Sequence, residues 1–555
     1  MANTFFIGSD VFKEIRRHNC YYIDKSLFIK EVVSVGHKVI LITRPRRFGK
    51  STNISMLNAF FDIDGEEDSS LFSELAIEKE KDVMDLWYRK HPVINISLSS
   101  MANASSHDYA LRMLSEIISE ECAKKSFLLK SLDISEFTAD KLRRLAKKEA
   151  PKEELIHSLK ILASALRSHF GETVVILIDE YDAPVNHDAQ EGFRKELLMD
   201  LSSFFGGVFK GNEDIELCVV TGCLRIANES IFTGANNLGV FTAKNKEFST
   251  SFGLTEPEVK KLLQHINFPE KLEEVTQWYN GYNFSGALMY NISDVMNYAN
   301  ALTNDPSAAP ANYWANTSSN EIVERSFRRQ HSRMEMISLL AGNSIGISRI
   351  DDNISFKRMK LPNAIWSVLF HTGYITADQG KPDFYKIPNR EIRVLFEDLY
   401  MDMTMELAGY ERIEGLNDAI LSFEAKKIED QFASFLLLLS WRDTASNLEY
   451  VYHSFFAGLL SHLGMSSNRE AGYGFFDIQV LFNNIYKLAI IFEFKRFDDK
   501  EGDVTLDDAA ERALKQIYDL KYPHNAEFDG YDVYCFGVGC LGRSCRVTGG
   551  LCNRS

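Results

Sequence analysis

A short basic segment near the N-terminus ends in glycine, lysine and serine, the residue types that hold phosphate groups. Residues 44–51 read Arg-Pro-Arg-Arg-Phe-Gly-Lys-Ser and follow the apolar run 38–43. A phosphate-binding loop requires Gly, four residues and then Gly-Lys-Ser/Thr, between a strand and a helix. The last three positions match, but Arg44 occupies the first glycine position. The spacing predicts a nucleotide site, and a basic turn without a ligand is the structural alternative.

The residues of this loop have defined roles if a nucleoside triphosphate binds. Gly49 lets backbone N–H groups face the phosphates at the start of a helix. We expect Lys50 to reach the β- and γ-phosphates and Ser51 to ligate Mg²⁺. Arg47 and Thr52 are predicted to contact the nucleotide as well, and the three arginines of the loop add positive charge in an acidic chain. ATP and Mg²⁺ are therefore the expected cofactors.

A second candidate group follows the apolar run 174–178, which ends in Asp179 and Glu180. In an ATPase the first carboxylate holds the Mg²⁺ shell and the second polarises the attacking water. A charged pair that caps a buried strand is the alternative. Thr221 is predicted to sense the γ-phosphate and Arg225 to neutralise charge in the transition state, although both residue types are as common in structural turns.

A third candidate group lies near the C-terminus, where Asp477 falls within the apolar run 475–481 and Glu493 and Lys495 lie in the run 488–495. Alternate side chains of a strand share a face, so Glu493 and Lys495 point the same way. If the two strands pair, Asp477 lies beside Glu493. Two such carboxylates are costly unless a cation joins them, and Mg²⁺ is the natural one. A Glu–Lys ion pair on a half-exposed strand is the alternative.

The first two groups need a sheet that brings strand ends together. Four short runs rich in Val, Ile and Leu lie at residues 38–43, 93–98, 174–178 and 216–221. Stretches with helical periodicity flank them, such as residues 51–61 and 154–169. Near-continuous apolar strands separated by helices predict a parallel sheet covered on both faces. A capping-box pattern at Thr255 and Glu258 predicts another helix start. Residues 1–270 are predicted to form an α/β domain.

The rest of the chain is predicted to hold a mostly helical connector, residues 271–400, and a second α/β domain, residues 401–555. The connector has a Pro/Ala/Asn-rich break at residues 300–311. Two helices are predicted further on, at residues 361–373 and 391–400, with a short hairpin between them at residues 374–387. In the second domain we expect two strands, a helix and a final strand, at residues 475–481, 488–494, 507–520 and 531–538.

Composition and charge narrow the classes of protein that fit. Of 555 residues, 45% are apolar and 25% are charged, which excludes wholesale disorder. The 62 Lys and Arg residues against 78 Asp and Glu residues give a net charge of −16, which excludes a strongly basic polyanion-binding protein. Any contact with nucleic acid must come from a local site.

Targeting and redox signals point to the cytoplasm. The N-terminus lacks a basic leader followed by an apolar stretch, so a secretory signal is not expected. The longest apolar run, residues 432–441, is shorter than the roughly 20 residues that span a bilayer and is predicted to be a buried helix. The eight cysteines include no C-x-x-C pair, so reduced thiols are expected, with a zinc site among the four C-terminal cysteines as a minor alternative.

Several motifs, in order, resemble the AAA-ATPase-like family of bacterial proteins. They lie at residues 21–26, 42–51, 177–182, 221–227, 231–237 and 278–282. Arginine in place of the first glycine is usual in that family. The resemblance implies a P-loop NTPase domain with the parallel sheet expected above.

The C-terminal region resembles the PD-(D/E)XK nuclease-like domain, which commonly follows the AAA-ATPase-like domain in one chain. The similarity lies in residues 452–460 and 467–474, Asp477 and residues 493–495. It implies a restriction-endonuclease-like α/β fold in which Asp477, Glu493 and Lys495 form the metal-binding and catalytic triad. Gln516 corresponds to an auxiliary polar position. A further acidic position would be Glu449 or Glu470, between which the sequence does not decide.

The combined expectation is a cytoplasmic Mg²⁺-dependent ATPase fused to a nuclease-like domain that cleaves phosphodiester bonds in DNA or RNA. Residues 401–555 hold 15 Lys and Arg against 24 Asp and Glu, a net charge of −9, so tight unaided DNA binding is not expected. The rival is a nucleotide-regulated switch or interaction protein with an inactive nuclease fold. No membrane partner is expected, and a homo-oligomer stays open without a coiled-coil heptad to support it.

Overall fold

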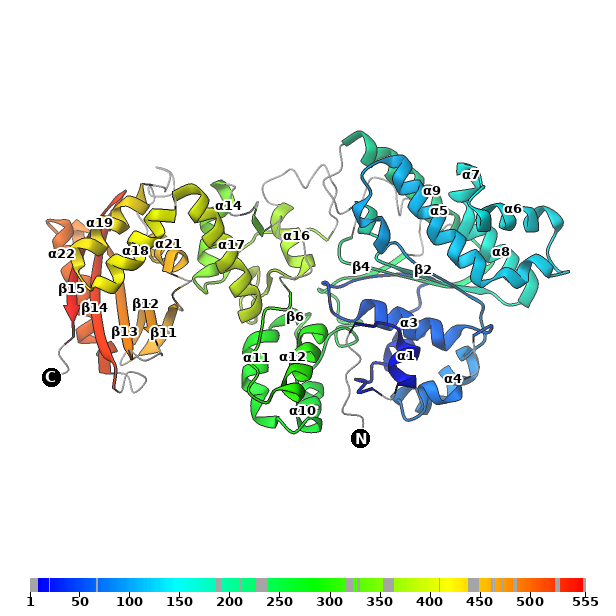
Figure 1. Ribbon diagram of the computed structural model, residues 1–555, viewed down its shortest axis with the longest axis horizontal. Helices are drawn as coiled ribbons and strands as arrows, with labels where there is room; N and C mark the ends of the chain where they lie inside the picture. The colour runs from blue at the N-terminus through cyan, green and yellow to red at the C-terminus, as the bar shows by residue number, and fades with distance from the viewer. Residues whose placement is uncertain are drawn as a thin grey trace. The chain divides into compact units, whose positions relative to one another are not determined.

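The structure is a computed structural model, and its described residues fall into two compact units (Figure 1). Described are residues 8–18, 20–65, 68–185, 191–209, 211–225, 238–314, 323–324, 326, 330–352, 364–408, 410–437, 449–460, 463, 465–471, 474–482, 487–524 and 530–552. The first unit is Met1–Tyr313 with Ser348–Gln379, and the second is Trp314–Ile347 with Gly380–Ser555. The segment predicted as a connector therefore contributes to both units.

A five-stranded parallel sheet forms the centre of the first unit. Its strands are β1 (Val39–Thr43), β2 (Val93–Ser97), β3 (Val174–Asp179), β4 (Ile215–Gly222) and β5 (Leu238–Phe241), in the order β2-β3-β4-β1-β5. Every neighbouring pair is parallel, as the sequence predicted. The carboxyl ends of parallel strands meet at one edge, so the loop after β1 and the carboxylates after β3 come together there.

Helices cover both faces of this sheet (Figure 1). On one face lie α5 (His107–Lys124), α6 (Glu136–Lys147), α7 (Lys152–Leu155), α8 (Ser158–Phe170) and α9 (Glu191–Phe209). On the other lie α1 (Phe12–Arg17), α3 (Lys50–Phe61) and α4 (Lys81–Trp87), and α2 (Leu27–Ser34) precedes β1. Leu114, Leu162 and Leu201 pack with the strands' Val and Ile side chains in one buried cluster.

A smaller helical part of the first unit follows the sheet. It contains α10 (Glu256–His265), α11 (Leu272–Tyr279), α12 (Ile292–Asn304), α16 (Ala364–Thr372) and the strands β6 (Tyr282–Phe284), β7 (Ala287–Met289) and β9 (Thr376–Ala377). The predicted capping box is present, because the Glu258 carboxylate accepts the Thr255 N–H at 2.7 Å. Buried residues of α10, α11 and α12 form their own core.

The second unit is built on a mixed five-stranded sheet in the order β11-β12-β13-β14-β15. These strands are β11 (Met465–Ala471), β12 (Gly474–Phe482), β13 (Leu488–Arg496), β14 (Asp532–Leu541) and β15 (Ser544–Leu551). The pair β13–β14 is parallel and the other three pairs are antiparallel. The remaining elements are α14 (Gln330–Leu340), β8 (Ile345–Gly346), β10 (Phe384–Lys386), α17 (Arg390–Ala408), α18 (Tyr410–Ser422), α19 (Ala425–Leu436), α21 (Glu449–Leu460) and α22 (Leu506–Asp519).

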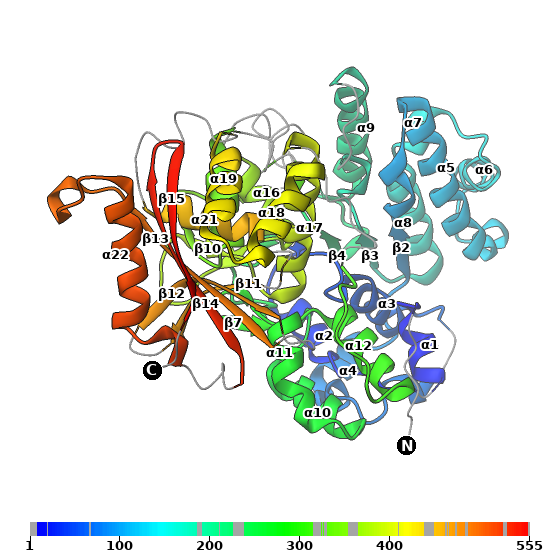
Figure 2. The same cartoon turned by 60° about the vertical axis from the view of Figure 1, so that its left-hand side comes forward.

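Helices lie on both faces of this mixed sheet (Figure 2). Two glycines of β14 let α22 lie close to this strand. A β-carbon at Gly537 would collide with the carbonyl oxygen of Ala510. A β-carbon at Gly539 would lie 2.5 Å from the carbonyl oxygen of Leu506. On the opposite face, Phe456 of α21 stacks on Phe494 of β13 at 5.2 Å. The second unit is thus an α/β layer structure, as predicted.

Two properties expected from the sequence can be compared with the described part of the chain. All eight cysteines are buried with free thiols, four in each unit. No helix in the described ranges is long and apolar enough to cross a membrane.

Candidate functional site

The loop between β1 and α3 has the backbone of a tight phosphate-type turn. Gly49 directly precedes α3 with φ of 79°, and Arg47 has φ of 66°. Glycine adopts this left-handed conformation without steric cost, whereas most other residues do not. The turn places Lys50, Ser51 and half-buried Thr52 in the first turn of α3.

The Lys50 ammonium is held by its own loop. Nζ donates hydrogen bonds to the carbonyl oxygens of Arg44 at 3.1 Å and Pro45 at 2.8 Å, and lies 3.5 Å from the Cys223 sulfur. Its side chain is buried although it is charged. Because an ammonium has only three donors, a bound phosphate would have to take the place of these acceptors.

Asp179 joins three strands of the parallel sheet at their carboxyl edge. Its Oδ2 accepts the Ser51 hydroxyl at 2.5 Å, and its Oδ1 accepts the Thr221 hydroxyl at 2.5 Å. The Glu180 N–H donates to the same Oδ1 at 3.0 Å. Ser51 follows β1, Thr221 lies in β4 and Asp179 ends β3, so the sheet topology alone brings these predicted residues together.

Glu180 differs from Asp179 in having no hydrogen bond or ion pair from its carboxylate to a described residue. Its φ is 51°, a left-handed value that turns the chain sharply after β3. Burial, and secondarily the charge of Asp179, raise the pKa of this carboxyl above its usual value. Glu180, Asp179 and Ser51 line a pocket of about 840 Å³, together with Asn95 and Ser97 of β2. The pocket leaves room for water beside both carboxylates.

Arg44 does not supply the positive charge expected at the loop. Its guanidinium is fully buried and donates to the carbonyl oxygens of Thr43 at 2.9 Å, Phe241 at 3.3 Å, Glu247 at 3.3 Å and Phe248 at 3.0 Å. Burial lowers the pKa of Arg44 to about 9. This side chain therefore fastens the end of β1 to β5 and to the chain beyond it, a role that a glycine could not fill.

The other two predicted arginines make no hydrogen bond or ion pair with Asp179 or Glu180 in the described part of the chain. Arg47 pairs with the fully buried Asp294 in the first turn of α12, at 2.7 Å. Arg225 follows β4 and makes no hydrogen bond or ion pair within the described ranges. Asp182, three residues after Asp179, accepts the N–H groups of Cys223 and Leu224 and so shapes the chain after β4.

The two carboxylates of the C-terminal group lie side by side, as the strand periodicity predicted. Ile478 of β12 is registered with Phe492 of β13, which puts Asp477 next to Glu493. The Asp477 N–H lies 3.3 Å from Glu493 Oε2, and the Phe494 N–H donates to Asp477 Oδ2 at 2.7 Å. Each carboxylate thus accepts a backbone N–H from the partner strand.

Glu493 is enclosed by donors from its own strand and from α22. Lys495 Nζ lies 3.5 Å from Glu493 Oε1, and Gln516 Nε2 donates to the same oxygen. The side chain of Glu493 is only 2% exposed. The Tyr522 hydroxyl lies 3.5 Å from Gln516 Nε2, and burial raises the pKa of that phenol. Sequence reasoning missed Tyr522, whose only signal is its position six residues after Gln516.

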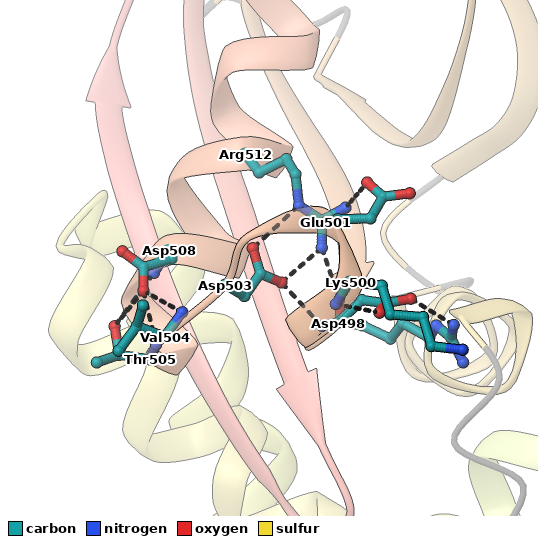
Figure 3. A network of polar contacts seen from close by, with 9 residues as sticks. Asp498, Lys500, Glu501, Asp503, Val504, Thr505, Asp508 and Arg512 are labelled. Carbon is teal, nitrogen blue, oxygen red and sulfur yellow. Dashed lines mark hydrogen bonds and ion pairs between the residues drawn. The ribbon is translucent and has the colours of Figure 1, made fainter.

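A network of charged and polar side chains holds the N-terminal half of α22 (Figure 3). The same helix carries Gln516. Arg512, one turn before Gln516, donates to both oxygens of Asp503, at 3.2 and 2.7 Å. It also reaches Glu501 at 3.1 Å and the carbonyl oxygen of Arg496, at the end of β13, at 2.9 Å. The network therefore ties the helix that carries Gln516 to the strand that carries Glu493.

The remaining predicted residues of this group are only partly described. Glu449 begins α21 and Glu470 lies in β11, but their side chains fall outside the described part, so the choice between them stays open. His453, predicted as a core residue, is buried and its Nε2 lies 2.9 Å from the carbonyl oxygen of Asp477. Within the described ranges, no three or more His, Cys, Asp or Glu side chains are grouped to hold a metal ion.

Two segments of the chain match known protein families. Residues 6–232 match the family model described as predicted AAA-ATPase, and residues 447–549 match that of the PD-(D/E)XK nuclease superfamily. An uncharacterized protein in the vnfD 5' region of Azotobacter chroococcum mcd 1 is 26% identical over 550 residues, covering 96% of this chain and 95% of that protein.

Similar solved structures were found as well. The Aeropyrum pernix ORC2 protein, in ADPNP–ADP complexes, aligns with 69% of this chain and 93% of its own at 12% identity and a TM-score of 0.31. Caenorhabditis elegans PCH-2 aligns with 67% of this chain and 70% of its own at 12% identity and a TM-score of 0.19.

Proposed function

We propose that this chain, which carries an AAA-ATPase-like domain and then a PD-(D/E)XK nuclease-superfamily domain, binds and hydrolyses ATP and cleaves nucleic acid with a metal ion. The observation that carries the first half is the 2.5 Å contact between the Ser51 hydroxyl and Asp179 Oδ2, across the intervening strand β4. This contact supports a site in which the Ser51 hydroxyl and the Asp179 carboxylate at the end of β3 would act on one ion.

The donor set at this edge fits Mg²⁺. Mg²⁺ in phosphate-transfer sites takes one or two protein oxygens and fills its other positions with water and phosphate oxygens. Ser51 Oγ and Asp179 Oδ2 supply two such oxygens within hydrogen-bond distance of each other. A bound Mg²⁺ would supply charge neutralisation on the β- and γ-phosphates.

The chain's own residues then have distinct roles in hydrolysis. Lys50 exchanges the carbonyl oxygens of Arg44 and Pro45 for phosphate oxygens. Thr221 keeps Asp179 in its orientation through the hydrogen bond to Oδ1. Glu180, whose carboxylate has no partner among the described residues and faces the pocket, accepts the proton of the attacking water.

A nucleotide titration tests this assignment. Isothermal titration of the full chain with Mg²⁺ and a hydrolysis-resistant β,γ-imido analogue of ATP is expected to show saturable binding. Lys50→Ala is expected to weaken it about 100-fold, because a charged hydrogen-bond donor to phosphate is lost. Lys38→Ala is the matched control, since the exposed Lys38 lies at the other end of β1 and reaches the carbonyl oxygen of Asn212. Unchanged affinity of Lys50→Ala would contradict the site.

For the C-terminal domain we propose metal-dependent phosphodiester cleavage. The adjacency of Asp477 and Glu493 supports it, because paired carboxylates on an apolar sheet suit a divalent cation with oxygen ligands. In that role the two carboxylates would hold Mg²⁺, and the ion would supply an activated water. Lys495 orients that water or stabilises charge on the phosphate, and Gln516 positions Glu493.

Cleavage assays test the second half separately. Single- and double-stranded DNA and RNA are incubated with the full chain and Mg²⁺ or Mn²⁺, with and without ATP. Asp477→Asn is expected to reduce cleavage about 1000-fold, as loss of a metal ligand removes the metal's contribution. The exposed Asp499→Asn is the matched control. Cleavage that survives in Asp477→Asn would come from a contaminant or another site.

Two observations favour the second candidate, a nucleotide-regulated switch with an inactive nuclease fold. Glu493 is 2% exposed and already satisfied by Lys495 and Gln516, and residues 401–555 carry a net charge of −9. Two results together would favour this candidate over the enzyme. ATP would bind without being hydrolysed over hours, and the Glu493→Gln variant would bind Mn²⁺ no more weakly than the wild type.

A further inference from the structure

The phosphate loop is fastened on one side by three of its side chains. Arg44 donates to carbonyl oxygens of β5 and of residues 247–248, and Arg47 pairs with Asp294. Phe48 packs edge-on against Tyr282 at 4.8 Å, and its carbonyl oxygen accepts the Gly253 N–H at 3.0 Å. These contacts use two of the three arginines of the loop for structure.

Arg46 is the remaining arginine, and its surroundings are different. It is exposed, and its guanidinium makes no hydrogen bond or ion pair with any residue in the described ranges. Desolvation opposes its charge, but the neighbouring Cys223, Tyr374, Asp182 and Glu180 outweigh that effect and raise the pKa of Arg46. Its charge therefore lies at the edge of the sheet where β3 and β4 end.

Arg46 lies near Cys223, which contacts Lys50, and near Glu180. The Cys223 sulfur is 3.5 Å from Lys50 Nζ, and Cys223 also neighbours Arg46. Glu180, the proposed base, is also within electrostatic range of Arg46 and of Lys50. The carboxylate of Glu180 is thus an electrostatic neighbour of both cations, Lys50 and Arg46.

The carboxylate of Asp182, an electrostatic neighbour of Arg46, is already hydrogen-bonded to backbone N–H groups. Asp182 Oδ2 accepts two backbone N–H groups, from Cys223 at 3.1 Å and Leu224 at 2.8 Å. A guanidinium that is always charged and has a planar fork of donors binds phosphate oxygens in a bidentate manner. Arg46 has that fork available, whereas the donors of Arg44 are used by carbonyl oxygens.

We propose that Arg46 binds the terminal phosphate of ATP and makes the site discriminate ATP from ADP. The proposal rests on nucleotide binding at Lys50 and Ser51, and it adds Arg46 to the residues that the sequence predicted to contact the nucleotide. Loss of Arg46 then affects the triphosphate and leaves the diphosphate, whose contacts are with Lys50 and the loop backbone.

The test compares the affinities of ATP and ADP in matched variants of the full chain. Titrations with ADP and with the β,γ-imido analogue of ATP, both with Mg²⁺, are run on the wild type, Arg46→Ala, Arg46→Lys and the control Arg112→Ala. Arg112 is an exposed arginine of α5 outside the site. Arg46→Ala is expected to weaken binding of the ATP analogue at least tenfold and binding of ADP less than threefold, because one charged bidentate contact is lost.

The conservative variant separates a specific contact from general charge. Arg46→Lys keeps the charge without the fork, so intermediate affinity for the ATP analogue is expected. An equal loss for both nucleotides, or no loss in Arg46→Ala, would overturn the assignment of Arg46 while leaving the nucleotide site in place. Failure of the wild type to bind either nucleotide would instead remove the proposed function itself, and with it this inference.

Discussion

The two carboxylate groups of this chain are positioned by different means. Asp179 lies at the carboxyl edge of a parallel sheet and is oriented by hydroxyls that come from β4 and from the loop after β1. Glu493 lies within a strand ladder and is oriented by an amide from α22. In the first case the order of the strands brings the residues together. In the second case α22 must pack on the sheet so that Gln516 reaches Glu493.

The same difference appears in their access to solvent. Glu180 and Asp179 line a pocket of about 840 Å³, whereas the Glu493 side chain is 2% exposed. A site at strand ends can hold an open carboxylate because the loops around it carry little of the core. A site within a sheet is covered by the helices that pack on the sheet. The position and solvent access of its carboxylate therefore depend on how those helices pack.

The largest expected effect tests the open site. Glu180→Gln removes the proposed base and keeps its size, so ATP turnover is expected to fall about 100- to 1000-fold with little change in ATP affinity. Phosphate release measured under saturating ATP checks it, with nuclease activity as an internal control. A turnover close to that of the wild type would show that the open carboxylate is not the base.

A second variant, in the loop of the open site, tests whether Arg44 stabilises the fold and does not contact ATP. Arg44→Gly restores the usual loop glycine but removes the guanidinium that donates to the carbonyl oxygens of Phe241, Glu247 and Phe248. We expect a loss of about 3 kcal/mol in the free energy of unfolding, since each unsatisfied buried acceptor is costly. Thermal unfolding measures the loss. A tenfold fall in ATP affinity of the folded variant would contradict a purely structural role.

A third pair of variants tests how far the closed site depends on helix packing. In Gly537→Ala the added β-carbon meets the backbone of α22, so we expect a loss of about 2–4 kcal/mol in stability and weaker Mn²⁺ binding. Gly550→Ala, in the neighbouring strand β15, meets nothing within 4 Å and is expected to change stability by no more than about 0.5 kcal/mol. Similar stabilities for the two variants would contradict the close packing of α22 on β14.

The smallest expected effect concerns pH. The hydrogen bond from Arg512 lowers the pKa of Asp503, as do the Asp498 N–H and the Arg512 charge, and these outweigh desolvation. A lowered carboxyl pKa stabilises the folded state above the unfolded value of about 3.9, and this contribution is lost as pH falls through the folded value. Arg512→Met is therefore expected to flatten the acid dependence of unfolding below about pH 4. Calorimetric scans between pH 2.5 and 7 measure it, and unchanged curvature would argue against the network.

Much of both sites could be predicted because their residues lie in apolar strands. The three runs that contain Thr43, Asp179 and Thr221 are buried almost throughout, which gives near-continuous Val, Ile and Leu in the sequence. The two-residue period of a strand predicted that Glu493 and Lys495 share a face, and Asp477 was expected beside Glu493 only if the two strands paired. The local pattern was sufficient for the strands, and the pairing is seen in the structure.

The parts that were missed depend on contacts distant in sequence. β5 is short and contains Gly239, and the seven residues of β11 are mostly polar, so neither has the pattern of a buried strand. The role of Arg44 depends on carbonyl oxygens about 200 residues away, which no spacing rule reveals. Tyr522 was missed for a similar reason, because it reaches Gln516 only after α22 has ended.

The burial of every cysteine gives this protein an internal reporter of local opening. Cys20, Cys122, Cys218 and Cys223 belong to the first unit, and Cys535, Cys540, Cys545 and Cys552 to the second. A thiol-specific reagent can modify a buried thiol only when the surrounding structure opens. Pulsed labelling followed by peptide mass spectrometry would therefore time the unfolding of the two units separately in one unmodified chain, and would show whether ATP slows the opening of one unit or of both.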